Sequence, residues 1–257
     1  MSWMPGTEVA RGATAVITRG EPGTVIKTLT KALPAIVVQL EAAGSRAAMA
    51  AGLPAPALIA ADLDADPPTL TFEYVEGTEL AKLYDVLGAE SIGRTLADLQ
   101  HRVRQVENPE VIPIEDFLGY QLDQGPIPEN LRAAARRDLV RLTAHSQRVL
   151  CHMDLHDANV LMGPDGPVMI DWMNASAAPP EADVARTRLV VGHEKFYSPD
   201  EETELGEMLA AYIARTEQLA PGVVGASREW DRVIAAARLD ENPPDAERAA
   251  ILARWER

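Results

Sequence analysis

The sequence contains little that would support a disulfide-stabilised or membrane-spanning protein. It has one cysteine, Cys151, in 257 residues. This excludes an internal disulfide framework and makes a reducing cytoplasm the expected compartment. Residues 1–15 lack a basic segment followed by an apolar core, so a signal peptide is not expected. The longest uncharged run, residues 47–61, is broken by Gly52, Pro54 and Pro56 and is not expected to cross a bilayer.

Positive charge is also scarce. The chain has 24 Lys and Arg against 39 Asp and Glu, a formal net charge of -15. Nucleic-acid backbones and anionic membranes repel such a chain, so we expect neither as a partner. The charge is compatible with a cationic small-molecule substrate, but an acidic surface also serves solubility alone, and both interpretations stay open.

Aromatic residues make up only 5% of the chain, and the apolar residues are mostly Ala and Leu, which favours helices over an all-β architecture. Strand-like segments are confined to the first part: a hairpin over residues 8–30, then strands near 57–61 and 70–74, with a helix over 34–51. Beyond Gly77, Ala/Leu/Arg/Glu-rich stretches predict helices over 78–87, 88–104, 128–146, 181–192, 200–219, 227–239 and 243–256. We therefore predict an α+β fold with two lobes, a β-rich lobe over residues 1–76 and a helical lobe over 77–257.

Residues 149–172 form the most unusual stretch. Two apolar segments, 160–162 and 168–170, flank a Gly-Pro-Asp-Gly-Pro turn, which predicts a hairpin. Asp171 follows the second segment, and a carboxylate at the end of a buried strand requires a partner or a metal. Several polar side chains precede the hairpin: His152, Asp154, His156, Asp157 and Asn159.

The polar residues of this stretch suggest three candidate chemistries. Zinc binding by His152 and His156 is disfavoured, because the segment runs directly into a strand and offers no further His or Cys except Cys151. A serine nucleophile is disfavoured because the chain has no G-x-S-x-G motif. The third is magnesium-assisted phosphoryl transfer, in which Asp154 accepts a proton from the attacking hydroxyl while Asn159 and Asp171 hold the metal.

Phosphoryl transfer also needs a cation on the nucleotide phosphates and a group that fixes this cation. Lys27 lies in the strand-like run TVIKTL, and Glu41 lies in the predicted helix 34–51, so the two make a suitable pair. On its own, Lys27 could equally be a solvent-facing strand residue. The chain contains no G-x-x-x-x-G-K-[ST] motif, which excludes a Walker-type phosphate cradle.

Taken together, these residues resemble the protein-kinase-like small-molecule phosphotransferases of the aminoglycoside phosphotransferase and choline kinase superfamily. The family pattern H-x-D-x-x-x-x-N matches His152, Asp154 and Asn159, and its I-D-W motif matches residues 170–172. Glu41 is followed eleven positions later by the G-x-P-x-P match at residues 52–56. The connector FEYVEG, residues 72–77, resembles the family hinge, and residues 183–185 match its D-x-A pattern.

The resemblance implies a two-lobed protein-kinase-like fold. It also implies an enzyme that uses ATP or GTP with Mg²⁺ to phosphorylate a hydroxyl of a small molecule. Asp154 would be the catalytic residue, and Asn159 and Asp171 would be the metal ligands. Nucleotide contacts would come from Lys27, Glu41, Thr14 of the phosphate loop 11–15, and the hinge residues Glu73 and Val75.

The chain departs from the family pattern at two positions of the catalytic loop. Met153 stands where the family often has Gly, and Asp157 stands where Pro or Gly is common. His152 is expected to brace the loop by hydrogen bonds, and Asp183 is expected to anchor it. His156 and Asp157 receive no firm role, and Arg186 and Arg188 are expected either at the surface or paired with nearby acids.

The acceptor is expected to lie against residues 78–150 and 193–257. An aminoglycoside or another amino-bearing molecule suits the acids of the helical lobe: Glu181, Glu194, Asp240 and Glu241. Antibiotic resistance and a metabolic or biosynthetic role both stay open, as does the oligomeric state. The alternative function is a catalytically silent nucleotide-binding pseudokinase or sensor, against which the intact Lys27, Asp154, Asn159 and Asp171 argue. A protein kinase is disfavoured because D-F-G and A-P-E motifs are missing.

Overall fold

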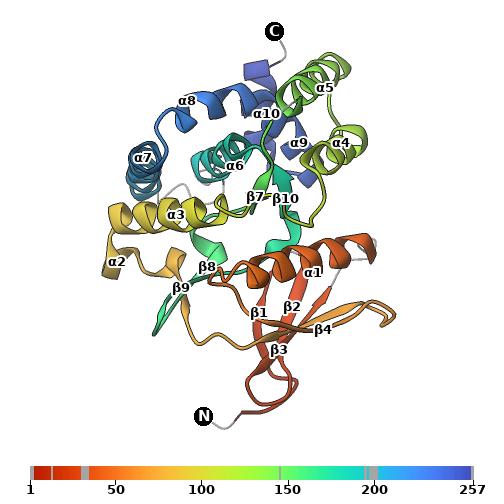
Figure 1. Ribbon diagram of the computed structural model, residues 1–257, viewed down its shortest axis with the longest axis vertical. Helices are drawn as coiled ribbons and strands as arrows, with labels where there is room; N and C mark the ends of the chain where they lie inside the picture. The colour runs from red at the N-terminus through yellow and green to blue at the C-terminus, as the bar shows by residue number, and fades with distance from the viewer. Residues whose placement is uncertain are drawn as a thin grey trace.

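The computed structural model describes residues 3–12, 14–29, 35–144, 146–193, 196 and 202–255. The α+β fold predicted from the sequence is confirmed: a β-sheet at the N-terminal end faces a mostly helical remainder (Figure 1). The sheet has five antiparallel strands in the order β1-β2-β3-β5-β4. Their bounds are β1 Glu8–Arg11, β2 Ala15–Arg19, β3 Thr24–Leu29, β4 Leu58–Asp62 and β5 Thr69–Glu73.

Helix α1, Ala35–Ala50, lies between this sheet and the helical part of the chain (Figure 1). Its apolar side packs on the sheet, where Val38 and Ala42 join Leu29 and Leu70 in one buried cluster. Burying an aliphatic side chain of this size contributes about 1.5–3 kcal/mol, so the cluster fixes α1 against the sheet. The fixed helix then presents Glu41 toward β3, as the side-chain contact with Lys27 demonstrates.

Two large apolar clusters lie among the remaining helices, beside a smaller one around Val184, Val223 and Val224. One unites α4, α5, α9 and α10 around Trp230 and Ile234, and the other joins α3 and α7 to the centre of the chain through Leu96, Trp172 and Tyr212. Among the described residues, no helix is both long and apolar enough to cross a membrane. The helices are α2 Tyr84–Leu87, α3 Ala89–Val103, α4 Ile114–Gln124, α5 Glu129–Thr143, α6 Pro180–His193, α7 Glu202–Leu219, α8 Val223–Ser227, α9 Asp231–Arg238 and α10 Asp245–Trp255.

Five short strands organise the centre of the chain. The predicted hairpin forms as β8, Val160–Gly163, and β9, Gly166–Met169, and β6, Thr78–Glu79, pairs with the other edge of β8. Strand β7, Val149–Cys151, pairs antiparallel with β10, Ser176–Ala178. The pairing of β7 with β10 holds both ends of the segment from residue 152 to residue 175, which contains the polar residues of interest.

Several elements differ from the sequence predictions. The helix predicted over 78–87 is wrong: residues 78–79 pair with β8, residues 80–82 form a 3₁₀ turn, and α2 covers only Tyr84–Leu87 before Gly88 ends it. Strand pairing therefore overrides the local helix preference there. Helix α4 was not predicted, and it contains Gly119, which weakens its helical signal. The three-residue strands β7 and β10 were also missed, because they are too short to show a periodic pattern.

Helix α1 also touches the segment that follows Asp171, and Gly44 makes this close approach possible. A Cβ atom at position 44 would lie 2.5 Å from the Trp172 carbonyl oxygen and 2.7 Å from the Ala175 Cβ. Any other residue would force the helix and this segment apart.

We expect Gly44→Ala to destabilise the protein by about 1–3 kcal/mol, because the added methyl group overpacks a backbone contact. The matched control is Gly206→Ala in α7, where an added Cβ meets nothing within 4 Å. There, helix propensity should stabilise the protein by about 0.5–1 kcal/mol. Urea unfolding measures both values, and equal stabilisation by the two substitutions would contradict the close packing of α1.

Candidate active site

The loop after β7 carries Asp154, and α6 holds this loop in place. Asp183 of α6 accepts the backbone N–H groups of His152 at 3.3 Å and Met153 at 2.8 Å. These bonds give Asp183 the anchoring role predicted for it. Burial raises the pKa of the Asp183 carboxyl, and the nearby His152 and the two N–H donors oppose that rise. Met153 adopts a left-handed backbone conformation with φ of 60°, which residues other than glycine rarely adopt.

His152 connects this loop to the segment before Asp171. Its ring is buried, packs 4.6 Å from the Trp172 ring between centroids, and places Nε2 3.1 Å from the Ile170 carbonyl oxygen. A carbonyl oxygen only accepts, so Nε2 carries the proton. Burial lowers the pKa of His152, which favours the neutral ring. His152 and His156 lie in a loop, so the helical arrangement considered for zinc does not form.

The hairpin β8–β9 places Asn159 and Asp171 at the same end. Asn159 directly precedes β8, Asp171 follows soon after β9, and the Ile170 N–H donates to the Asn159 carbonyl oxygen at 3.0 Å. The Asn159 side-chain amide donates to the Asp154 carbonyl oxygen at 2.9 Å. This hydrogen bond uses the Nδ2 end of the amide and leaves Oδ1 as the end able to bind a cation.

Lys27 joins the sheet to this hairpin. Its Nζ lies 2.7 Å from Glu41 Oε1 and 3.1 Å from Asp171 Oδ1, a residue 144 positions away. Lys27 is therefore not the solvent-facing residue that its strand alone would have allowed. Burial by itself would lower the pKa of Lys27, but the carboxylates of Asp171 and Glu41 outweigh it and raise this pKa above its ordinary value.

The donor set around Asp171 suits a magnesium ion. The Asp171 side chain is 35% exposed, whereas that of Glu41 is 3% exposed, so Asp171 is the carboxylate with an accessible face. Mg²⁺ prefers oxygen ligands and usually takes one or two from the protein, with the rest from phosphates and water. Asp171 and the Asn159 amide oxygen fit that pattern. Within the described ranges, no three His, Cys, Asp or Glu side chains gather to hold a metal by themselves.

Two further contacts were not specifically predicted. Arg186 of α6 places Nη2 3.1 Å from Asp154 Oδ1, and this guanidinium outweighs burial and holds the pKa of Asp154 below its ordinary value. Tyr84 donates its hydroxyl to Asp157 Oδ2 at 2.8 Å. Burial alone would raise the pKa of Asp157, but hydrogen bonds from His156 and Tyr84 lower it. Asp157 thus fastens the loop to the start of α2, and nothing in its sequence neighbourhood pointed to Tyr84.

The remaining residues predicted to contact the nucleotide lie in or next to the five-stranded sheet. Thr14 is half-buried between β1 and β2, Glu73 is the exposed last residue of β5, and Val75 is half-buried in the connector before β6. The Glu73 backbone N–H donates to the Ala57 carbonyl oxygen at 2.8 Å, which ties the start of the connector to the approach to β4. Ala13 of the phosphate loop lies outside the described residues.

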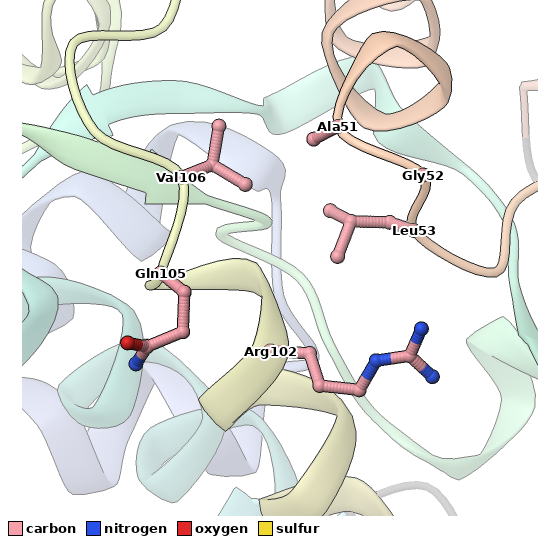
Figure 2. A pocket seen from close by; sticks show the side chains of 6 residues that line it. All are labelled: Ala51, Gly52, Leu53, Arg102, Gln105 and Val106. Carbon is pink, nitrogen blue, oxygen red and sulfur yellow. The ribbon is translucent and has the colours of Figure 1, made fainter.

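A cavity of about 420 Å³ lies between the end of α1 and the end of α3. Figure 2 shows the side chains that line it. It is lined by residues 51–53 on one side and by Arg102, Gln105 and Val106 on the other. None of the predicted active-site residues lines this cavity, so it is separate from the cluster around Lys27 and Asp171.

Comparison with known proteins identifies a family. A family model described as phosphotransferase enzyme family matches residues 5–223. Comparison with curated proteins gives no match.

Solved structures show the same fold. An aminoglycoside-3'-phosphotransferase of type VIII has a TM-score of 0.64 at 19% identity, covering 92% of this chain and 93% of its own. A choline/ethanolamine kinase family protein from Mesorhizobium loti has 0.63 at 16%, covering 97% and 86%. An aminoglycoside phosphotransferase from Streptomyces rimosus, solved with ADP and streptomycin, has 0.63 at 16%, covering 91% and 93%.

The Lys27–Glu41 pair generates a stability prediction. Lys27→Met should cost about 3–5 kcal/mol in the free energy of unfolding at pH 7, because it leaves the buried Glu41 carboxylate without its cation. Lys27→Met combined with Glu41→Gln should recover most of this loss. The exposed pair of Lys82 and Glu79, 2.9 Å apart, provides the control, and Lys82→Met should change stability by less than about 1 kcal/mol.

The penalty of Lys27→Met should depend on pH in a defined direction. Without the lysine, burial and Asp171 both raise the pKa of Glu41 in the folded protein. The folded state then binds the proton more tightly than the unfolded state, so stability falls as pH rises through that pKa and recovers as pH falls. Urea unfolding between pH 5 and pH 8 measures this slope. A penalty that is constant with pH, or that persists in the double variant, would contradict the pairing.

Proposed function

The chain belongs to the phosphotransferase enzyme family, and we propose that it transfers the γ-phosphate of a nucleoside triphosphate to a hydroxyl group of a small molecule. The observation that carries the proposal is the position of Lys27, which contacts Glu41 and Asp171 together. A lysine fixed by a buried carboxylate beside a second, accessible carboxylate is the arrangement that positions nucleotide phosphates next to a metal.

Each residue in the proposed reaction has one task. Lys27 contacts the nucleotide phosphates, with Glu41 fixing its side chain. Asn159 and Asp171 hold Mg²⁺, which supplies positive charge to the phosphate oxygens when bound. The acceptor hydroxyl oxygen attacks the γ-phosphorus, its proton passes to Asp154, and the bond to the β,γ-bridging oxygen breaks to release the nucleoside diphosphate.

The nucleotide is proposed to lie along the sheet region. Thr14 in the turn between β1 and β2 would approach the phosphates, and the backbone of Glu73 and Val75 in the connector would contact the base. The structure from Streptomyces rimosus was solved with ADP, which favours ATP over GTP as the donor. We also propose a cytoplasmic location, because the single cysteine is compatible with a reducing compartment.

The acceptor is proposed to lie beside Asp154, whose side chain is 27% exposed. The solved relatives include proteins named for aminoglycosides and for choline or ethanolamine, all amino-bearing alcohols. Glu241 was expected to bind such an amine, but its carboxylate already contacts Arg186 and Arg238. Asp240 and Glu181 remain as partly exposed acids for this purpose, and Glu194 lies outside the described residues.

The test is nucleoside diphosphate release with a panel of aminoglycosides, amino sugars and amino alcohols. We expect at least one acceptor to be phosphorylated by the wild type. Asp154→Asn should lower kcat by about 10²–10⁴-fold, because it removes the proton acceptor, and should keep the thermal shift caused by magnesium nucleotide.

Asp157→Asn is the matched control from the same loop. It should lower Tm, because it weakens the contact with Tyr84, while turnover largely persists. Wild-type turnover in Asp154→Asn would contradict the assigned role. A wild type that binds magnesium nucleotide but phosphorylates none of the panel would favour the silent nucleotide-binding alternative.

A further inference from the structure

Arg186 occupies a central position behind the catalytic loop. It extends from α6, its side chain is 5% exposed, and it reaches three acceptors on two separate parts of the chain. Nε donates to the Met153 carbonyl oxygen at 3.1 Å, and Nη2 donates to Asp154 Oδ1 at 3.1 Å and to Glu241 Oε2 at 2.9 Å. A guanidinium presents its donors in a rigid fork, so three simultaneous bonds leave it one orientation.

The first consequence concerns Met153. Its N–H is bound by Asp183 and its carbonyl oxygen by Arg186, and these two residues lie three positions apart on one face of α6. Met153 is held in the left-handed region, which is unfavourable for a residue with a side chain. The two bonds from α6 hold both polar groups of this residue and so compensate for the unfavourable backbone conformation.

The second consequence concerns the direction of the Asp154 carboxylate. Arg186 engages Oδ1, and the Asn159 amide holds the backbone carbonyl oxygen of the same residue. The carboxylate is therefore fixed by one of its oxygens. In the proposed reaction, Oδ2 would then be the oxygen that faces the acceptor hydroxyl.

The third consequence concerns Glu241, the other carboxylate that Arg186 contacts. Glu241 ends the 3₁₀ turn Leu239–Glu241 after α9, and it is also contacted by Arg238 and, at 3.3 Å, by Gln121. Arg238 in turn contacts Glu247 of α10 at 3.0 Å, and Glu247 is fully buried. A continuous set of alternating charges thus runs from Glu247 of α10 to Asp154, and Arg186 is the arginine next to Asp154.

We propose that Arg186 is the positioning residue for Asp154, holding the carboxylate and the Met153 peptide in the geometry that phosphoryl transfer requires and tying them to Glu241. This inference rests on the proposed function, but its geometric part stands on contacts that do not depend on turnover. In the proposed reaction, Arg186 contacts neither the nucleotide nor the metal and acts only through Asp154 and Met153.

The experiment compares Arg186→Gln, Arg186→Lys and Arg188→Gln. Arg188 is the matched control: it lies two positions further on α6 and is mostly buried. Its guanidinium binds Asp231 at 2.9 Å and Ser227 at 3.1 Å, away from the catalytic loop. Each glutamine variant removes one mostly buried arginine and its ion pair from the same helix, but only Arg186→Gln also removes the contact with Asp154. Comparing the two variants therefore distinguishes the loss of any ion pair from the loss of this contact.

With an acceptor from the panel, Arg186→Gln should lower kcat about 10²-fold, the scale expected when a reacting group is misplaced by about 1 Å. The KM for nucleotide should stay within about twofold, because Lys27 and Asp171 are untouched. Arg186→Lys keeps the charge but not the fork, so it should recover part of kcat. Arg188→Gln should leave kcat and KM unchanged even if Tm falls. Equal losses in Arg186→Gln and Arg188→Gln, or a nucleotide KM that rises in step with the fall in kcat, would overturn the proposal.

Amide hydrogen exchange gives a readout that needs no turnover. Arg186→Gln should speed exchange in the peptide containing residues 152–155, and Arg188→Gln should not. If no acceptor is phosphorylated by the wild type, the proposed function fails and this measurement alone decides the positioning role. Unchanged exchange in Arg186→Gln would then overturn it.

Discussion

The contact between Lys27 and Asp171 is the constraint on which the rest of the site depends. Together with the Lys27–Glu41 contact, it brings two carboxylates to one ammonium group. Asp171 lies 144 positions away in the sequence, and Glu41 is almost fully buried. A buried charge without a partner is costly, so the sheet, α1 and the hairpin β8–β9 must meet in one arrangement. Gly44 lets α1 approach the Asp171 segment closely enough for this, and the apolar cluster around Val38 holds the helix there.

Helix α6 is a second scaffold, which holds the loop that carries Asp154. Asp183 and Arg186 on α6 bind the two polar groups of Met153, and His152 bonds to the strand end before Asp171. The loop itself has no regular structure beyond the 3₁₀ turn at residues 157–159, so its geometry comes from these side chains. Functional groups on a loop are held in precise positions only when a packed scaffold supports the loop. Helix α6 supplies that scaffold here.

Much of this arrangement follows from local signals in the sequence. The Gly-Pro-Asp-Gly-Pro turn predicted the hairpin that carries Asp171, and the β-branched run around Lys27 predicted its strand. Contacts between distant elements were not readable in the same way. A helix pattern does not reveal that Arg186 reaches Asp154, and an acidic residue such as Glu241 gives no sign that arginines already neutralise it. The failed helix over 78–87 has a similar cause, because pairing of residues 78–79 with β8 is a tertiary effect.

Binding of Mn²⁺ tests the assigned metal site most directly, because Mn²⁺ substitutes for Mg²⁺ at oxygen sites and is observed by electron paramagnetic resonance. Titrating Mn²⁺ into protein with nucleoside diphosphate should reveal a bound ion in the wild type and in Asp154→Asn. Asp171→Ala should weaken its binding by about tenfold or more, because a carboxylate ligand is lost. Equal Mn²⁺ affinity in Asp171→Ala and the wild type would contradict the assignment of Asp171 as the metal ligand, and with it the proposed reaction.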